Sequence, residues 1–131
     1  MKNESVKSYE DVCKIKGIDP VASLPFPDPK TPEEKAINGF TKVIRTIEVL
    51  NGDWKPDWNN YNQPKYYPLW DMRSPKGAVV GSAAGFSYHG YDYDDSFSDL
   101  SSRLVLKDRK SAEHIAKYFI DDYRAFMVIE G

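Results

Sequence analysis

The positions of the prolines limit where regular secondary structure can form in this chain. Five of the nine prolines fall within residues 19–32, and three more fall within residues 53–70. Proline has no backbone N–H and biases the preceding residue toward extended conformations, so neither stretch is a regular helix or a central strand. We therefore expect residues 19–31 to form an extended connector, held to the body of the protein by Leu24 and Phe26. Residues 53–70 are expected to form a long ordered loop that leads into a strand.

Between these two stretches lies a segment with the signals of one amphipathic helix. Thr31 is a suitable N-cap, Pro32 fits the first helical position, and Glu34 completes a capping box. Asn51 and Gly52 tolerate left-handed backbone and commonly end helices. Apolar residues recur between these signals at steps of three and four, as on one face of a helix; they are Ile37, Phe40, Val43, Ile44, Ile47 and Leu50.

Two further helices are expected nearer the ends of the chain. A short helix has Ser8 as its N-cap and ends at Gly17, and the last helix has Asp108 as its N-cap. Residues 1–7 are expected to be disordered. The apolar stripe of the last helix consists of Ala112, Ile115, Ala116, Phe119, Tyr123 and Phe126. We expect a core in which both main helices contact one sheet face through Phe40, Ile44, Ile47, Ile115, Phe119 and Tyr123.

Residues that favour strands predict a small sheet. The expected strands are residues 67–72, 83–88 and 103–107, with a turn over residues 90–98. Gly81 and Gly85 mark a bend or bulge. Because the links between the strands are short, they form an antiparallel meander, with the two main amphipathic helices on one face. The sequence thus predicts a single α+β domain over residues 1–131, with a short N-terminal helix and a long aromatic loop.

Composition excludes several classes of protein. No run of 18 apolar residues is present, so no membrane span is expected, and no apolar stretch follows the first residues as in a signal peptide. Cys13 is the only cysteine, which excludes an internal disulfide and fits a reducing compartment. We expect it to be a small buried hydrophobe on the first helix. The net charge of −2 gives no general attraction to nucleic acid or to anionic membranes.

One acidic segment invites a calcium interpretation. Asp92, Asp94, Asp95 and Asp99 lie in a stretch without any lysine or arginine, residues 77–102. An EF-hand loop beginning at Asp92 needs glycine and glutamate at positions that hold Phe97 and Arg103. We therefore expect a solvated acidic turn, with an irregular cation site as the alternative.

The histidines and glycines carry no recognisable catalytic motif. His89 and His114 lack the spacing of a metal site, and no nucleophile or phosphate-binding motif is present. His114 is expected near the surface of the last helix. His89 lies among tyrosines, where it is the candidate general base if the protein is an enzyme. We expect no metal and no cofactor.

The most distinctive feature is an aromatic segment. The chain has 18 aromatic residues, 14% of the total, and six of them lie within residues 54–70. We expect Trp54, Trp58 and Tyr67 to point mainly inward, with Tyr61, Tyr66 and Lys65 at the surface. The favoured interpretation is a second hydrophobic cluster beneath the loop. A protein partner, single-stranded nucleic acid and a sugar are the alternatives. The candidate binding patch is Trp58, Asn60, Tyr61, Gln63, Lys65 and Tyr66.

Several strings in this chain resemble one family. They include Gly-Ile-Asp-Pro at residues 17–20, Trp-Lys-Pro-Asp-Trp-Asn-Asn at residues 54–60, Lys-Tyr-Tyr-Pro at residues 65–68 and Ser-Arg-Leu at residues 102–104. The chain resembles, over nearly its whole length, small proteins common in phages and prophages of gut Bacteroidetes. The resemblance implies an intracellular, phage-related protein in the cytoplasm of the bacterial host. It implies no established activity and no catalytic residue.

Together these observations favour a non-enzymatic protein-binding or structural module. The partner is expected to be a phage or host protein. Single-stranded nucleic-acid binding through residues 54–70 is the first alternative, and an enzyme with a site around His89 is the second.

Overall fold

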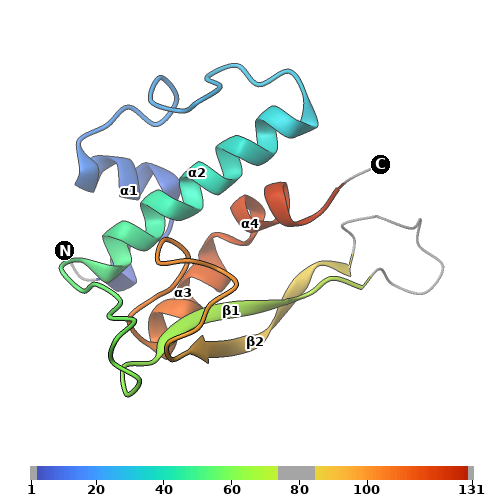
Figure 1. Cartoon of the computed structure of the whole chain (residues 1–131). Coiled ribbons are helices and arrows are strands. Elements are labelled where there is room, and N and C mark those ends of the chain that lie inside the picture. The colour runs from blue at the N-terminus through green and yellow to red at the C-terminus, as the bar shows by residue number, and fades with distance from the viewer. Residues whose placement is uncertain (1–2, 74–84, 130–131) are drawn as a thin grey trace.

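The computed structural model describes residues 3–73 and 85–129. Helices and a two-stranded antiparallel sheet make up the described part, which confirms the α+β class. In Figure 1 the sheet lies at the bottom, α3 and α4 lie above it, and α2 lies farther from it. The elements are η1 (Asn3–Ser5), α1 (Tyr9–Lys16), α2 (Pro32–Asn51), β1 (Lys65–Asp71), β2 (Ser87–Asp94), α3 (Arg109–Tyr118) and α4 (Ile120–Met127).

The helices pack differently from our expectation. Both strands pack against α3, whereas α2 packs mainly against α4 and α1. Ile47, Ile115, Phe119 and Tyr123 are buried as predicted. Phe40 is 38% exposed, and its ring lies 5.3 Å from the Phe126 ring of α4 in a T-shaped pair. Ile44 is half-buried. The prediction that both main helices contact one sheet face is therefore wrong.

A glycine sets the closeness of the α2–α4 contact. A Cβ placed on Gly39 would lie 2.7 Å from both the Ala125 Cβ and the Asp122 carbonyl oxygen. Real Cβ atoms do not approach other heavy atoms so closely, so only glycine permits this crossing. The apolar periodicity of α2 contains no sign of this contact.

The predicted helix ends are confirmed. Thr31 accepts from the Glu34 N–H, and Glu34 accepts in return from the Thr31 N–H, which is a capping box. Ser8 caps α1, and Gly17 ends it with a φ of 68°.

The last helix, expected to be continuous, breaks at Phe119, whose ψ is 22°. The break keeps α3 on the sheet and directs α4 across α2.

The sheet differs from the prediction in its second strand. The first predicted strand is close to the observed β1, but β2 replaces the strand expected over residues 83–88. Residues 83–84 of that expected strand, and Gly81 of the expected bend, lie outside the described residues. The part of the expected turn that covers residues 90–94 is wrong. Here tyrosine and aspartate alternate, a period-two pattern that fits a strand. The register shift lies at His89, the extra residue opposite the Leu69–Trp70 step, and not at Gly85.

The expected third strand is reduced to one bridge. Leu106 exchanges two backbone hydrogen bonds with Tyr66, of 2.9 and 2.7 Å. On its other side the buried Asn51 amide donates to the Val105 carbonyl and accepts from the Lys107 N–H. A side chain at the end of α2 thus satisfies backbone groups that a strand neighbour would otherwise pair.

The N-terminal segment and the connector are both held to the helices. Residues 1–7 were expected to be disordered; within the described part, Val6 lies in the hydrophobic core. The connector is irregular, as predicted, and Leu24 packs against the core. The buried Asn38 amide bonds the Phe26 backbone through both its oxygen and its nitrogen. Polar side chains of α2 therefore fix the connector.

Two compositional expectations are also met in the described residues. Cys13 is buried in the core on α1, as a small hydrophobe would be. None of the helices in the described ranges has the length and apolar character needed to cross a membrane.

Candidate functional site

The candidate patch is organised around Lys65. This residue was predicted to lie at the surface, but it is buried. Lys65 begins β1 and is 0% exposed. Its ammonium group donates to the Asn60 carbonyl at 3.1 Å and to the Asp95 carbonyl, and it lies 5.1 Å from the centre of the Trp58 ring. Burying a charged group is costly unless it is paired, and these partners supply the pairing. Lys65 therefore ties the aromatic loop to the segment after β2.

Two other members of the predicted patch also stabilise the loop itself. The Trp58 indole donates to the Ser102 hydroxyl at 2.7 Å. Gln63 accepts from the Asp57 N–H at 2.6 Å and donates to the Lys55 carbonyl at 3.2 Å. The polar groups of Trp58 and Gln63 are therefore taken up by hydrogen bonds within the protein, as expected for an ordered loop stabilised by its own side chains.

The remaining members lie at or near the surface. Tyr61 is 70% exposed and Asn60 is exposed, whereas Tyr66 is half-buried and packs against the core. Trp54 and Tyr67 are half-buried. The structure thus brings Trp58, Asn60 and Lys65 together, and it leaves Tyr61 as the freely accessible aromatic residue of the predicted patch.

Sequence reasoning missed a second group of aromatic residues, on β2. Tyr88, Tyr91 and Tyr93, which we call the tyrosine row, are each more than one-third exposed, and Tyr93 reaches 51%. The Tyr66 ring lies 5.8 Å from the rings of both Tyr91 and Tyr93, so the row continues the aromatic surface of β1. The sequence signal for this group is the alternation of tyrosine and aspartate, although the aspartates and Gly90 also favour a turn. Phe97, which is 90% exposed, follows just beyond the strand.

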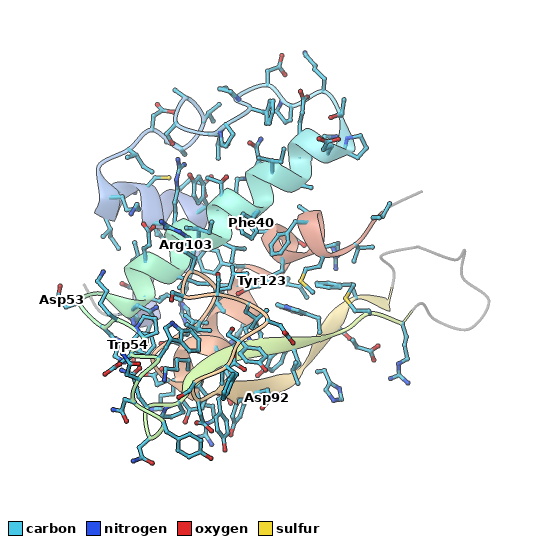
Figure 2. All side chains as sticks on the ribbon, viewed as in Figure 1. Phe40, Asp53, Trp54, Asp92, Arg103 and Tyr123 are labelled. Atoms are coloured by element: carbon cyan, nitrogen blue, oxygen red, sulfur yellow. The ribbon has the colours of Figure 1, made fainter. Side chains whose placement is uncertain are left out.

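Acidic side chains accompany the tyrosine row. The described residues 85–102 hold Asp92, Asp94, Asp95 and Asp99 and no lysine or arginine. Figure 2 shows Asp92 beside the sheet. The pKa of Tyr67 is raised to about 12, mainly by burial and in addition by the neighbouring Asp94 and Asp92 carboxylates. Tyr67 therefore stays protonated near neutral pH.

One cation already contacts the row. The Arg109 guanidinium at the start of α3 lies 5.9 Å from the centre of the Tyr91 ring. Its hydrogen bond with Tyr91 raises the pKa of Arg109 above its ordinary value. Arg109 also pairs with Glu113 at 3.7 Å. The row is thus compatible with a guanidinium group against its rings.

The two histidines lie apart from this surface chemistry. His89 is exposed on β2. Arg73 holds the pKa of nearby Asp71 well below its ordinary range, and a charge on His89 acts in the same direction. His114 bonds the Val6 carbonyl at 2.6 Å and its ring lies 4.8 Å from the Tyr118 ring, so it is half-buried and not free at the surface as expected. Within the described ranges, no three His, Cys, Asp or Glu side chains form a group that could hold a metal ion.

A groove lies between two of the helices. It has a volume of about 810 Å³ and lies between the N-terminal end of α2 and the C-terminal end of α4. Its floor is largely apolar and includes Ala36, Ala125 and Phe126, with Glu33 and Arg124 among its charged residues. Neither histidine lines it. The groove combines no set of titratable groups that would define a reaction.

Comparisons with known proteins give no relative. No protein-family model matches the chain, and neither a curated protein nor a solved structure matches it significantly. The functional conclusion therefore depends on the surface of this chain.

Proposed function

We propose that the protein is a non-enzymatic protein-binding module that docks its partner on the tyrosine row. The observation that carries this proposal is that Tyr88, Tyr91 and Tyr93 lie partly exposed along a single strand. Tyrosine is enriched in protein interfaces because it supplies a large contact area and a hydroxyl group at a small cost in side-chain entropy. Phe97, three residues after β2, is a further exposed aromatic residue.

The nucleic-acid alternative receives less support from the same geometry. Binding of single strands combines aromatic faces with positive charge. Lys55 and Lys65 are the lysines of the aromatic segment: the Lys65 amine is bound to two carbonyl groups of the fold, which leaves Lys55 as the exposed one. The charged side chains next to the tyrosines along β2 are aspartates, and Arg109, the cation that contacts the row, is paired with Glu113. We expect no salt-dependent gel shift with single-stranded DNA or RNA, and a clear shift would favour this alternative.

The phage association is a further part of the proposal. It rests on the sequence resemblance alone, as do the expected phage or host partner and the expected location in the bacterial cytoplasm. The tyrosine row supports binding of a protein without indicating its source.

The test is a selection from a random peptide library displayed on phage particles. We expect peptides that bind the wild-type protein and lose at least tenfold in affinity when Tyr91 and Tyr93 are both replaced by serine. Tyr61→Ser removes an exposed tyrosine from the aromatic loop and tests the patch predicted from the sequence. Melting temperatures of all variants show whether a loss of binding reflects a loss of folding. If every selected peptide depends on Tyr61 and none depends on the tyrosine row, the proposed docking surface is wrong.

A further inference from the structure

The outer edge of β2 has backbone groups available for another strand. Tyr66 uses both its N–H and its carbonyl for the bridge to Leu106. Since antiparallel partners alternate between bonded and non-bonded pairs, Tyr66 and its register partner Tyr93 form a non-bonded pair. Tyr93, and Tyr91 two residues before it, therefore direct their N–H and carbonyl groups away from β1.

No backbone group in the described ranges pairs with that edge. The Tyr93 N–H donates to the carboxylate of its own neighbour, Asp92, at 2.8 Å, a local bond that an incoming carbonyl can replace. Sheet edges of this kind are sites where extended peptides bind by strand addition, because main-chain hydrogen bonds supply affinity without requiring a particular sequence.

We infer from this edge and its charges that the partner presents an extended segment rich in lysine and arginine. This segment would join the sheet as a strand beside β2. This inference rests on the proposed function above. The exposed Asp92 and Asp99, with the half-buried Asp94 and Asp95, attract positive side chains, and residues 85–102 hold no lysine or arginine that would compete. The Arg109 guanidinium over Tyr91 shows that the rings of this row accept such a group.

A second copy of the chain is a poorer occupant of the same edge. Pairing β2 with β2 of another molecule would bring Asp92 and Asp94 of the two strands close together. Like charges across an interface disfavour that association. The charge therefore favours a basic partner over self-pairing.

The experiment compares three synthetic eight-residue peptides by fluorescence anisotropy at low salt. The first alternates arginine or lysine with threonine or valine, the second replaces the basic residues by glutamate, and the third carries a central proline in the basic sequence. Proline removes a main-chain donor and disrupts strand pairing. We expect the first peptide to bind and the other two to bind at least tenfold more weakly. Hydrogen exchange of the Tyr91 and Tyr93 amides should slow only with the first peptide.

A matched pair of variants tests the charge. Asp92→Lys should weaken binding of the basic peptide by at least tenfold, and Asp53→Lys, which makes the same charge change on the loop after α2, should leave it within about twofold. Figure 2 shows the two aspartates in different parts of the structure. Tyr91→Pro should block the edge from the protein side, since proline is tolerated where the N–H of an edge strand faces solvent. If that variant does not fold, the proline-containing peptide gives the same test.

Three results would overturn the inference. They are equal binding of the proline-containing peptide, binding unaffected by Asp92→Lys, and binding that protects no amide of β2. If library selection instead yields non-basic peptides that need the tyrosine row, this inference fails and the proposed function stands. If selection yields no peptide that depends on the row, both fail.

Discussion

At the scale of single residues, the buried ammonium group of Lys65 holds the aromatic loop in place through its hydrogen bonds. Lys65→Met keeps a chain of similar length but leaves the Asn60 and Asp95 carbonyls without this donor. Hydrogen bonds to charged groups contribute more than neutral ones, so we expect the free energy of unfolding to fall by about 2 kcal/mol. Urea denaturation measures this change. Lys55→Met, on an exposed lysine of the same loop, should change it by less than about 0.5 kcal/mol.

The stability of Lys65→Met also tests which interactions keep the aromatic loop ordered. If Lys65→Met is as stable as wild type, the apolar contacts of the loop suffice and the buried amine is dispensable. Replacement of buried ionic groups by apolar ones is sometimes neutral, which makes the experiment informative.

Asp122 gives the protein a pH dependence opposite to that of most carboxylates. Burial raises its pKa to about 6, with Asp121 and Glu10 acting in the same direction and Lys42 opposing them. The folded state therefore binds a proton that the unfolded state releases near pH 4. The free energy of unfolding should fall as pH rises from about 4 to about 6, and this contribution should be constant above about pH 7. One pKa unit corresponds to about 1.4 kcal/mol, so the full effect is about 3 kcal/mol at most.

Two amide substitutions isolate this effect. Asp122→Asn removes the titrating group and should flatten the stability profile between about pH 4 and pH 7 relative to wild type. Asp121→Asn, at the exposed neighbour, removes a smaller contribution to the raised pKa and should keep most of the slope, because burial is the main cause. A wild-type profile that rises through this range, with no difference in the Asp122→Asn variant, would contradict the assignment.

At the scale of elements, the Asn51 side chain replaces a strand neighbour. Asn51→Ala leaves the Val105 carbonyl and the Lys107 N–H without their buried partner. An unpaired buried group costs about 1–3 kcal/mol, so the loss in the free energy of unfolding should be about 3 kcal/mol. Asn51→Asp keeps an acceptor for Lys107 but cannot donate to Val105, so it should also destabilise. Asn59→Ala, at an exposed amide, is the matched control and should have little effect. An Asn51→Ala protein with wild-type stability in urea would show that solvent satisfies these groups.

The helices were predictable because their signals are local. The Thr31 capping box, the Gly17 end and the period of three and four residues all act within a few turns of the chain. The sheet was less predictable because strand pairing depends on distant partners. Nothing near residues 103–107 indicates that Asn51 takes up two of their backbone groups. The break at Phe119 arises because α3 packs on the sheet and α4 packs on α2. The apolar stripe of the last helix is continuous in the sequence and does not indicate this change of partner.

The candidate site was predictable only in part. Tyr61 lies at the surface as expected, because nothing in its polar surroundings supplies a core contact. Lysine is among the residues least often buried, so composition alone favours an exposed Lys65. Its burial depends on the Asn60 and Asp95 carbonyls, which come from segments on either side of it in the sequence. The tyrosine row was hidden because the same aspartates that suggest a turn also occur on a strand edge.

At the scale of the whole molecule, helices cover one side of a small sheet whose outer strand is acidic. Figure 1 shows β2 away from the helical layer formed by α1 and α2. An exposed strand edge is prone to pair with copies of itself, and charge is a common means of preventing this. We therefore expect the aspartates of the β2 region to have a role independent of any partner, which is to keep the edge from pairing with other copies.

Neutralising this charge should therefore produce self-association. We expect the Asp92→Asn/Asp99→Asn variant to form dimers or larger species in sedimentation velocity experiments, at a concentration where wild type is monomeric. The Asp28→Asn/Asp53→Asn variant has the same net charge but changes exposed residues elsewhere, and it should remain monomeric. Adding Tyr91→Pro to the first variant should restore the monomer, because the edge then lacks a donor. If both aspartate pairs cause equal association, the effect comes from net charge, and the edge of β2 has no special part in it.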